Sequence, residues 1–198
     1  MQKEFSFACG SGWENHFTET YSVVAGSARE HFVQREDGIE NIALGDGKHY
    51  AYISAAYREK LTRGASISVD CSFVSYGAPL VTLANEIGSD RDGHPLYGDH
   101  YEIVVYEGGC NVWYVKKAPE GSPSPFTAEN PLRLYFPIKG GERVTLKVAT
   151  GVRTGFLSVE LCGHRFEVPA PHLAEQFYVG FTACEGINRF YSAEISNP

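Results

Sequence analysis

The feature that most limits the fold of this chain is a set of apolar residues that recur at every second position. Ile67, Val69, Cys71 and Phe73 alternate with polar residues, and the same period returns at 144–148 and 157–161. A period of two is that of a β-strand with one face in a core and the other in water or against a ligand. We therefore expect a chain of one-sided strands.

The alternation and the turn residues together predict an all-β fold. The expected strands lie at about 16–25, 29–35, 48–56, 66–73, 79–86, 99–107, 110–117, 143–148, 157–161, 164–168, 176–184 and 188–196. Short helices are considered only at 55–62 and 171–176, and the stretches 88–99 and 118–131 are expected to be surface loops. This many one-sided antiparallel strands fit one domain over 1–198, a two-sheet antiparallel β-sandwich of the jelly-roll type.

Charge and cysteine content narrow the partners and the location. The 17 Lys and Arg residues against 24 Asp and Glu give a net charge of −7, so we expect neither nucleic acid nor an anionic membrane surface as a partner. The five cysteines are scattered without a C-x-x-C pair, which favours reduced thiols in the core. A signal peptide and a membrane span are not expected either, which favours a cytoplasmic location. The sequence leaves the oligomeric state open.

Two stretches resemble the concanavalin A-like lectin/glucanase superfamily. Residues 176–186 followed by 188–195 resemble its closing strand pair, and 143–149 followed by 155–168 resemble one of its hairpin regions. The resemblance is one of strand pattern over the C-terminal part of the chain. It implies a β-sandwich that handles carbohydrate on its concave sheet.

One predicted hairpin suggests which face would hold a ligand. With Gly108 and Gly109 as a two-residue turn, Val104 opposes Trp113 and Ile103 opposes Tyr114, and opposed residues share a face. The predicted core face carries Tyr101, Ile103, Val105, Val112 and Tyr114. The predicted open face carries His100, Glu102, Val104, Tyr106, Asn111, Trp113 and Lys117.

The open face suits a sugar, since a sugar ring needs a flat apolar surface beside directional polar groups. Trp113 is the predicted platform, and Glu102, His100, Tyr106 and Asn111 are the predicted hydrogen-bonding groups. The leading hypothesis is thus a protein that binds an oligosaccharide or a sugar derivative. Alternatively, a loop or solvent simply covers this face.

Two further loops contain candidate site residues. Glu185 and Arg189 are predicted ligand-binding residues in a turn near the end of the chain, unless they only form an ion pair. Asp90 and Asp92 have the D-x-D-G spacing that can place carboxylates around calcium, although a solvated acidic turn explains them as well. His94 and His100 flank this loop, so a transition-metal site is a further alternative.

An enzyme is the competing hypothesis. Glycoside hydrolysis needs two carboxyl groups, and Glu102 is the predicted first, with Glu86, Asp90 or Glu185 as the second. The E-x-D-x-x-E strand of the superfamily's glucanases is absent. A polysaccharide lyase with His100 as a catalytic group is a weaker enzyme hypothesis. A third class is a structural or oligomerisation module that uses an exposed sheet face.

Overall fold

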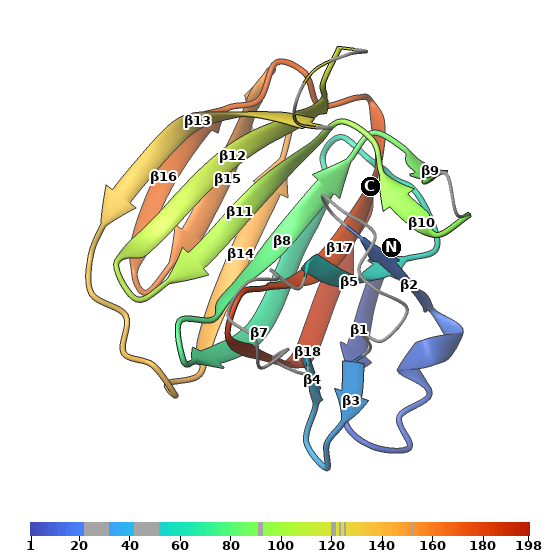
Figure 1. Cartoon of the computed structure of the whole chain (residues 1–198), viewed down its shortest axis with the longest axis vertical. Coiled ribbons are helices and arrows are strands. Elements are labelled where there is room, and N and C mark those ends of the chain that lie inside the picture. The colour runs from blue at the N-terminus through green and yellow to red at the C-terminus, as the bar shows by residue number, and fades with distance from the viewer. Residues whose placement is uncertain are drawn as a thin grey trace.

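Two packed β-sheets make up nearly all of the regular structure in the computed structural model of the chain (Figure 1). The structure describes residues 1–21, 32–41, 52–90, 93–119, 122, 124, 126–151 and 153–198. All strand pairs in these ranges are antiparallel except the short contact between Leu96 and Tyr21. This arrangement confirms the predicted two-sheet jelly-roll sandwich.

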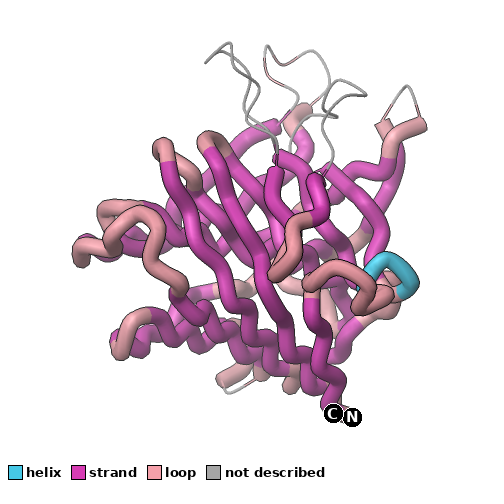
Figure 2. The backbone as a smooth tube through the Cα atoms, turned by 90° about the horizontal axis from the view of Figure 1, so that it is seen from below, coloured by secondary structure: helices cyan, strands magenta, loops and turns pink. Residues whose placement is uncertain are grey.

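Within the described residues, one sheet has eight strands in the order β16-β15-β14-β7-β18-β4-β3, with β1 paired to β18. Its strands are β1 (Gln2–Ser6), β3 (Phe32–Gln34), β4 (Ile39–Asn41), β7 (Ser66–Val74), β14 (Val144–Thr150), β15 (Phe156–Leu161), β16 (His164–Pro169) and β18 (Ile187–Ser196). The first and last strands pair, so the two ends of the chain lie side by side (Figure 2).

The second sheet has ten strands over the same described ranges, in the order β13-β12-β11-β8-β17-β5-β2-β10-β9, with β6 paired to β17. Its strands are β2 (Phe17–Tyr21), β5 (Tyr52–Tyr57), β6 (Leu61–Thr62), β8 (Ala78–Ala84), β9 (Ile87–Ser89), β10 (Pro95–Tyr97), β11 (His100–Tyr106), β12 (Gly109–Lys117), β13 (Phe126–Tyr135) and β17 (Gln176–Cys184). One 3-10 turn, η1 (Trp13–Asn15), precedes β2. No helix among the described residues is long and apolar enough to cross a membrane.

The core lies between the sheets and contains every second side chain of the long strands. Ile67 and Val69 of β7 meet Ile103 and Val105 of β11 in one continuous apolar cluster. Aromatic rings extend this cluster toward the N-terminal strands, where Phe5 packs edge-on against Phe17 at 5.1 Å between ring centroids. Because the inner faces are filled in this way, the outer faces of the two sheets are left for other contacts.

The cysteines divide into two groups. Cys71, Cys110 and Cys184 are buried, while Cys9 and Cys162 are exposed. Burial raises the pKa of Cys71 and of Cys110 to about 12. These two thiols therefore act as small apolar side chains, as the sequence predicted for most of the five.

Several local predictions were wrong. Residues 52–57 form β5 instead of the considered helix at 55–62, because Ile53, Ala55 and Tyr57 alternate into the core and tertiary packing overrides alanine's helix propensity. The second helical candidate, 171–176, is a turn that leads into β17. The expected loop at 118–131 contains the start of β13, and the expected loop at 88–99 contains the end of β9 and all of β10. The predicted strands at 16–25, 29–35 and 48–56 lie partly outside the described residues.

The β11–β12 hairpin turns one residue earlier than predicted, at Glu107 and Gly108. Glu102 therefore opposes Trp113, and Val104 opposes Asn111. The physical reason is that Gly109 belongs to β12: a Cβ there would lie 2.2 Å from the backbone oxygen of Leu134 on β13. When a two-residue turn moves by one position, the residue opposite each position of β11 changes by two. Because side chains alternate with a period of two, every side chain stays on its predicted face.

A hydroxyl chain joins three neighbouring strands to the β10 segment on the outer face of the ten-stranded sheet. Thr82 and Thr182 have their Oγ1 atoms 2.7 Å apart, Thr182 donates to Ser54 Oγ at 2.9 Å, and Ser54 Oγ lies 2.8 Å from Tyr97 Oη. Tyr97 lies over Gly180, where a Cβ would be 1.8 Å from its Oη. Because residue 180 is a glycine, the Tyr97 side chain can pack directly on the sheet.

We expect Gly180→Ala to lower the free energy of unfolding by about 1–3 kcal/mol, because the added methyl group displaces the buried Tyr97 hydroxyl. Urea unfolding would measure the change. Gly88→Ala is the matched control, since its Cβ would find nothing nearer than 4.0 Å. Equal stability of the two variants would contradict the close packing of Tyr97 on residue 180.

Candidate functional site

A groove of about 370 Å³ lies on the outer face of the ten-stranded sheet. We call it the aromatic groove. It is lined by Tyr52, Ala78, Leu80, Glu102, Val104, Tyr106, Asn111, Trp113, Val115, Phe126, Ala128, Cys184 and Glu185. These residues come from β5, β8, β11, β12, β13 and β17 and from the turn that follows β17, so the groove runs across the strands. Its volume is that of a small-ligand site.

Trp113 sits where β12 and β13 lose their regular register. The pairing shifts between Val112 and Tyr114, and the amide of Asn130 donates to the backbone oxygen of Val112 at 2.8 Å. A β-bulge of this kind re-aims a side chain. The indole lines the groove half-buried, on the face that alternation along β12 assigns to it, and the guanidinium of Arg133 lies 6.0 Å from its ring centroid.

Glu102 faces Trp113 across the β11–β12 pair and is itself buried. Its Oε1 lies 3.2 Å from Nε2 of His100, two residues earlier on the same face of β11. His100 is also buried and is absent from the groove lining. The structure thus brings the two predicted residues together, with Glu102 at the groove and His100 behind it.

The far side of the groove is formed by Tyr52 and Cys184. Burial raises the pKa of Tyr52, and the adjacent Cys184 adds to the rise. Burial also raises the pKa of the Cys184 thiol, so both groups stay protonated near neutral pH. They offer a hydroxyl and a soft apolar surface instead of charge.

Glu185 reaches the same groove from the turn between β17 and β18. Its backbone is left-handed, with φ at 56°, and Asn188 Nδ2 donates to the backbone oxygens of Cys184 and Glu185 at 3.1 and 3.0 Å. A non-glycine residue held in this conformation is uncommon and concentrates at functional sites. The groove thus contains both of the predicted site residues Glu102 and Glu185.

Tyr106 and Asn111 complete the predicted set on the open face. Burial raises the pKa of the Tyr106 hydroxyl, which therefore stays neutral. The Oδ1 atom of Asn111 is shielded from solvent and has no hydrogen-bond partner among the described residues. Such an amide is a polar group at the groove wall whose hydrogen-bonding capacity is not used up.

Three predicted site residues lie elsewhere or outside the described ranges. Glu86 is exposed, next to Gly98, and does not line the aromatic groove. Arg189 belongs to β18 of the other sheet, where its Nε donates to Glu40 Oε2 at 3.0 Å and its Nη1 lies 3.6 Å from Asp37. Asp92 lies outside the described residues.

Asp90, the other predicted metal ligand, is engaged within its own loop. Its Oδ1 accepts from the backbone nitrogen of His94 at 2.8 Å, and its Oδ2 lies 3.2 Å from the Nδ1 atom of the same residue. Across the described ranges, no group of three or more His, Cys, Asp and Glu side chains is arranged to hold a metal. His100 points instead to Glu102, on the face of the sheet that carries the groove.

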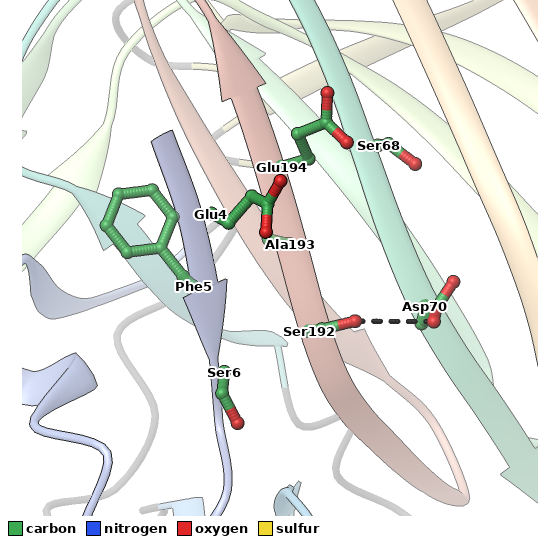
Figure 3. Close-up of a pocket in the computed structure, with 8 residues that line it drawn as sticks. All are labelled: Glu4, Phe5, Ser6, Ser68, Asp70, Ser192, Ala193 and Glu194. Carbon is green, nitrogen blue, oxygen red and sulfur yellow. Dashed lines mark hydrogen bonds between the residues drawn. The ribbon is translucent and has the colours of Figure 1, made fainter. Parts of the chain in front are cut away.

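A second groove, of about 490 Å³, lies on the outer face of the eight-stranded sheet and is lined by acidic and small side chains (Figure 3). We call it the acidic groove. Glu4 and Glu194 oppose each other across β1 and β18, and Phe5 turns away from them into the core. Asp70 accepts from Thr145 Oγ1 at 2.6 Å and from Arg143 Nη2 at 2.7 Å. Phe5 is the one aromatic residue among the described residues that line this groove, and because it packs into the core, it gives the groove no flat aromatic surface.

Sequence reasoning missed several residues of the aromatic groove. Phe126 and Ala128 alternate at the start of β13, but the surrounding prolines made this stretch look like a loop. Tyr52 and Cys184 lie in predicted strands. They reach the groove because β17 and β5 follow β8, which is the neighbour of β11, in the order of the sheet. Alternation contained the signal for Phe126, whereas the position of Tyr52 depends on long-range pairing.

No protein-family model and no curated protein sequence matches the chain. Solved structures with the same fold include a Bacillus subtilis protein of unknown function with a galectin-like fold, with a TM-score of 0.61, 9% identity, and coverage of 100% of this chain and 98% of that one. The carbohydrate-binding module CBM66 of Bacillus subtilis has a TM-score of 0.55, 12% identity and coverage of 88% and 97%. β-Agarase A, solved with oligoagarose, has a TM-score of 0.57, 10% identity and coverage of 89% and 82%. These likenesses show the fold, a galectin-like jelly-roll sandwich, which is the fold that the strand pattern predicted.

Asp70 in the acidic groove gives a prediction for acid stability. Burial raises the pKa of this carboxyl group, but the hydrogen bonds from Thr145 and Arg143 outweigh it, so the pKa is lower than usual. A depressed folded-state pKa stabilises the protein above the unfolded value, and this contribution is lost as the pH falls through the folded value. We expect the wild type to lose more stability than Asp70→Asn as the pH is lowered from about 5 towards about 2.

Urea unfolding at several pH values would measure this difference. Glu107→Gln, which removes an exposed carboxylate from the β11–β12 turn, is the control and should follow the wild type. Parallel stability curves for the wild type and Asp70→Asn would show that the hydrogen bonds to Asp70 add nothing.

Proposed function

We propose that this chain binds an oligosaccharide or a sugar derivative in the aromatic groove. The observation that carries the proposal is the position of the Trp113 indole directly across the strand pair from the Glu102 carboxyl group, within one groove. A sugar ring presents apolar C–H faces and hydroxyl groups, so it is recognised by this pairing of flat apolar surface with polar groups.

Each lining residue has a role in this proposal. Trp113 stacks on a sugar ring, and Tyr52 and Phe126 supply further aromatic surface at either side of the groove. Glu102 and Asn111 exchange hydrogen bonds with hydroxyl groups. Tyr106, whose pKa is raised by burial, donates from a neutral hydroxyl group.

The fold supports the carbohydrate class without naming the sugar. One structure of the same fold is named as a carbohydrate-binding module, and another was solved with an oligosaccharide of agarose. Fold alone does not determine function, so the residues of the groove are the main support for this proposal. The groove crosses several strands, which suits a short oligosaccharide better than a single sugar.

Glycoside hydrolysis is the second candidate, favoured by one specific observation. Glu102 and Glu185 both line the aromatic groove although 83 residues separate them in the chain. Hydrolysis of a glycosidic bond uses a pair of carboxyl groups on either side of the bond. Among the second carboxylates considered from the sequence, Glu185 is the one that this groove contains.

The first test is binding. We expect Trp113→Ala to weaken oligosaccharide binding by about tenfold or more, because the stacking surface is lost. Thermal unfolding of the wild type and the variant, with oligosaccharides of agarose, of β-1,3-linked glucose and of N-acetylglucosamine, would measure it, since a ligand of the native state raises the midpoint.

Tyr191→Ala is the matched control for this test, because Tyr191 is a half-buried aromatic residue on the eight-stranded sheet and should leave binding unchanged. If no sugar at millimolar concentration shifts the wild-type midpoint, the carbohydrate proposal is wrong. A change in sedimentation of Trp113→Ala in that case would favour an interaction module.

The second test separates binding from hydrolysis. If Glu102 and Glu185 are a catalytic pair, Glu185→Gln should abolish product release from these oligosaccharides while binding is largely retained, and the wild-type rate should follow a bell-shaped pH profile. Chromatography of the reaction mixtures would detect the products. Wild-type binding without any product would rule out hydrolysis of the sugars tested and leave the binding proposal intact.

A further inference from the structure

An exposed arginine lies beside the aromatic platform of the groove. Arg133 of β13 is directly opposed to Asn111 of β12, and its guanidinium is 6.0 Å from the ring centroid of Trp113. Asn111 and Trp113 both line the aromatic groove. Because opposed residues of neighbouring strands share a face of the sheet, Arg133 stands at the edge of the groove where β13 closes it (Figure 1). We call this edge, made by Asn111, Arg133 and Tyr135, the β13 rim.

Arg133 has no acidic partner among the described residues. Its contacts are the Trp113 ring and the hydroxyl oxygen of Tyr135, which lies 3.4 Å from its Nη1 atom. In contrast, Arg143 on the other sheet has its Nη2 atom 2.7 Å from a carboxylate oxygen of Asp70. The bond to Tyr135 uses one of the five N–H groups of the Arg133 guanidinium. Its positive charge and its other N–H groups are therefore available to a ligand.

Tyr135 adds a second donor to the β13 rim. It follows Arg133 by two residues on β13, so it lies on the same face, and it is 74% exposed. Its oxygen accepts the hydrogen bond from Arg133, which leaves its own proton for a ligand. The hydroxyl group of Tyr106, which lines the groove on the same face, can donate as well.

The carboxyl groups of the aromatic groove lie further along the sheet. Glu102 belongs to β11, two strands from β13, and Glu185 follows β17, which is four strands away. Neighbouring strands are about 4.8 Å apart, so these two strands lie roughly 10 Å and roughly 20 Å from β13, which is at or beyond the screening length in physiological salt. Positive charge and hydrogen-bond donors therefore prevail at the β13 rim.

Asn111 supplies an acceptor at the same place. Its Oδ1 atom is shielded from solvent and has no hydrogen-bond partner among the described residues. A hydroxyl group of a ligand in the groove would satisfy it. Asn111 and Trp113 are two residues apart on one strand, so their Cα atoms are roughly 7 Å apart. A sugar ring stacked on Trp113 can thus place a hydroxyl group at Asn111 and another substituent at Arg133.

We propose that the β13 rim is an acidic-sugar subsite, in which Arg133 binds the carboxylate or sulfate group of a sugar that stacks on Trp113. The proposal rests on the proposed function and names its substrate class, an oligosaccharide with uronate or sulfated units. The planar guanidinium donates two parallel hydrogen bonds to the acidic group, and the Tyr135 hydroxyl donates to the same group. The net charge of −7 does not oppose this contact strongly, because distant charges are screened by salt.

Matched pairs of ligands that differ only in the acidic group test the subsite. The pairs are hexagalacturonate and its methyl ester, the β-1,4-linked hexamer of glucuronate and cellohexaose, and neocarrahexaose and its desulfated form. We expect the wild type to bind the acidic member of at least one pair about tenfold more tightly than the neutral member. Isothermal titration calorimetry would measure the affinities. The two uronate pairs and the sulfate pair distinguish the two kinds of acidic group.

Variants then assign the preference to a residue. Arg133→Gln removes the charge, so the ratio of acidic to neutral affinity should fall about tenfold. Arg133→Lys keeps the charge without the planar fork and should retain part of the preference. Lys116→Gln is the matched control and should keep the wild-type ratio. It removes the same charge from β12, but the Lys116 side chain points away from the groove face and lies 2.7 Å from Glu129.

The outcomes separate this inference from the proposed function. Equal affinity for both members of every pair contradicts the acidic-sugar subsite and keeps the carbohydrate site. If Arg133→Gln weakens both members of a pair equally, Arg133 only supports the Trp113 ring, and the subsite is wrong. A preference for acidic sugars that Arg133→Gln leaves unchanged contradicts the assignment to Arg133. Absence of binding by acidic and neutral sugars alike contradicts the carbohydrate site itself.

Discussion

The packing of the two sheets against each other is the constraint on which the rest of the structure depends. Residues such as Val69 and Ile103 fill the space between the sheets, and their strand neighbours must then point outward. This packing does not fix the side chains of the two outer faces, and these faces differ. The outer face of the ten-stranded sheet is aromatic and polar around Trp113, and that of the eight-stranded sheet is acidic around Glu4 and Glu194.

The aromatic groove contains groups that lower the free energy of unfolding unless their surroundings hold them. A buried carboxyl group, a buried histidine and a left-handed glutamate each disfavour folding unless their surroundings hold them. Here the Gly98 carbonyl orients His100, and Asn188 braces the turn of Glu185. The buried carboxyl group and the buried histidine occur together at this groove, which is what singles it out within the described residues.

How far the sequence predicted this protein depends on the range of the interaction. The faces of β11 and β12 could be predicted, because alternation assigns Trp113 and Glu102 to one side even when the hairpin slips by two residues. β13 was missed because prolines mask its pattern, and its approach explains the glycine at 109. Arg189 was grouped with Glu185, yet β17 and β18 belong to different sheets, which local patterns do not encode.

The place of β17 in the middle of the ten-stranded sheet affects the order of assembly. It pairs with β8 from Tyr178 opposite Ala84 to Cys184 opposite Ala78, across about a hundred residues of chain. Contacts between such distant segments form slowly, since a long loop must close first. The groove floor is therefore incomplete on a growing chain until β17 emerges, and until then the edge of β8 is open to pairing with other chains.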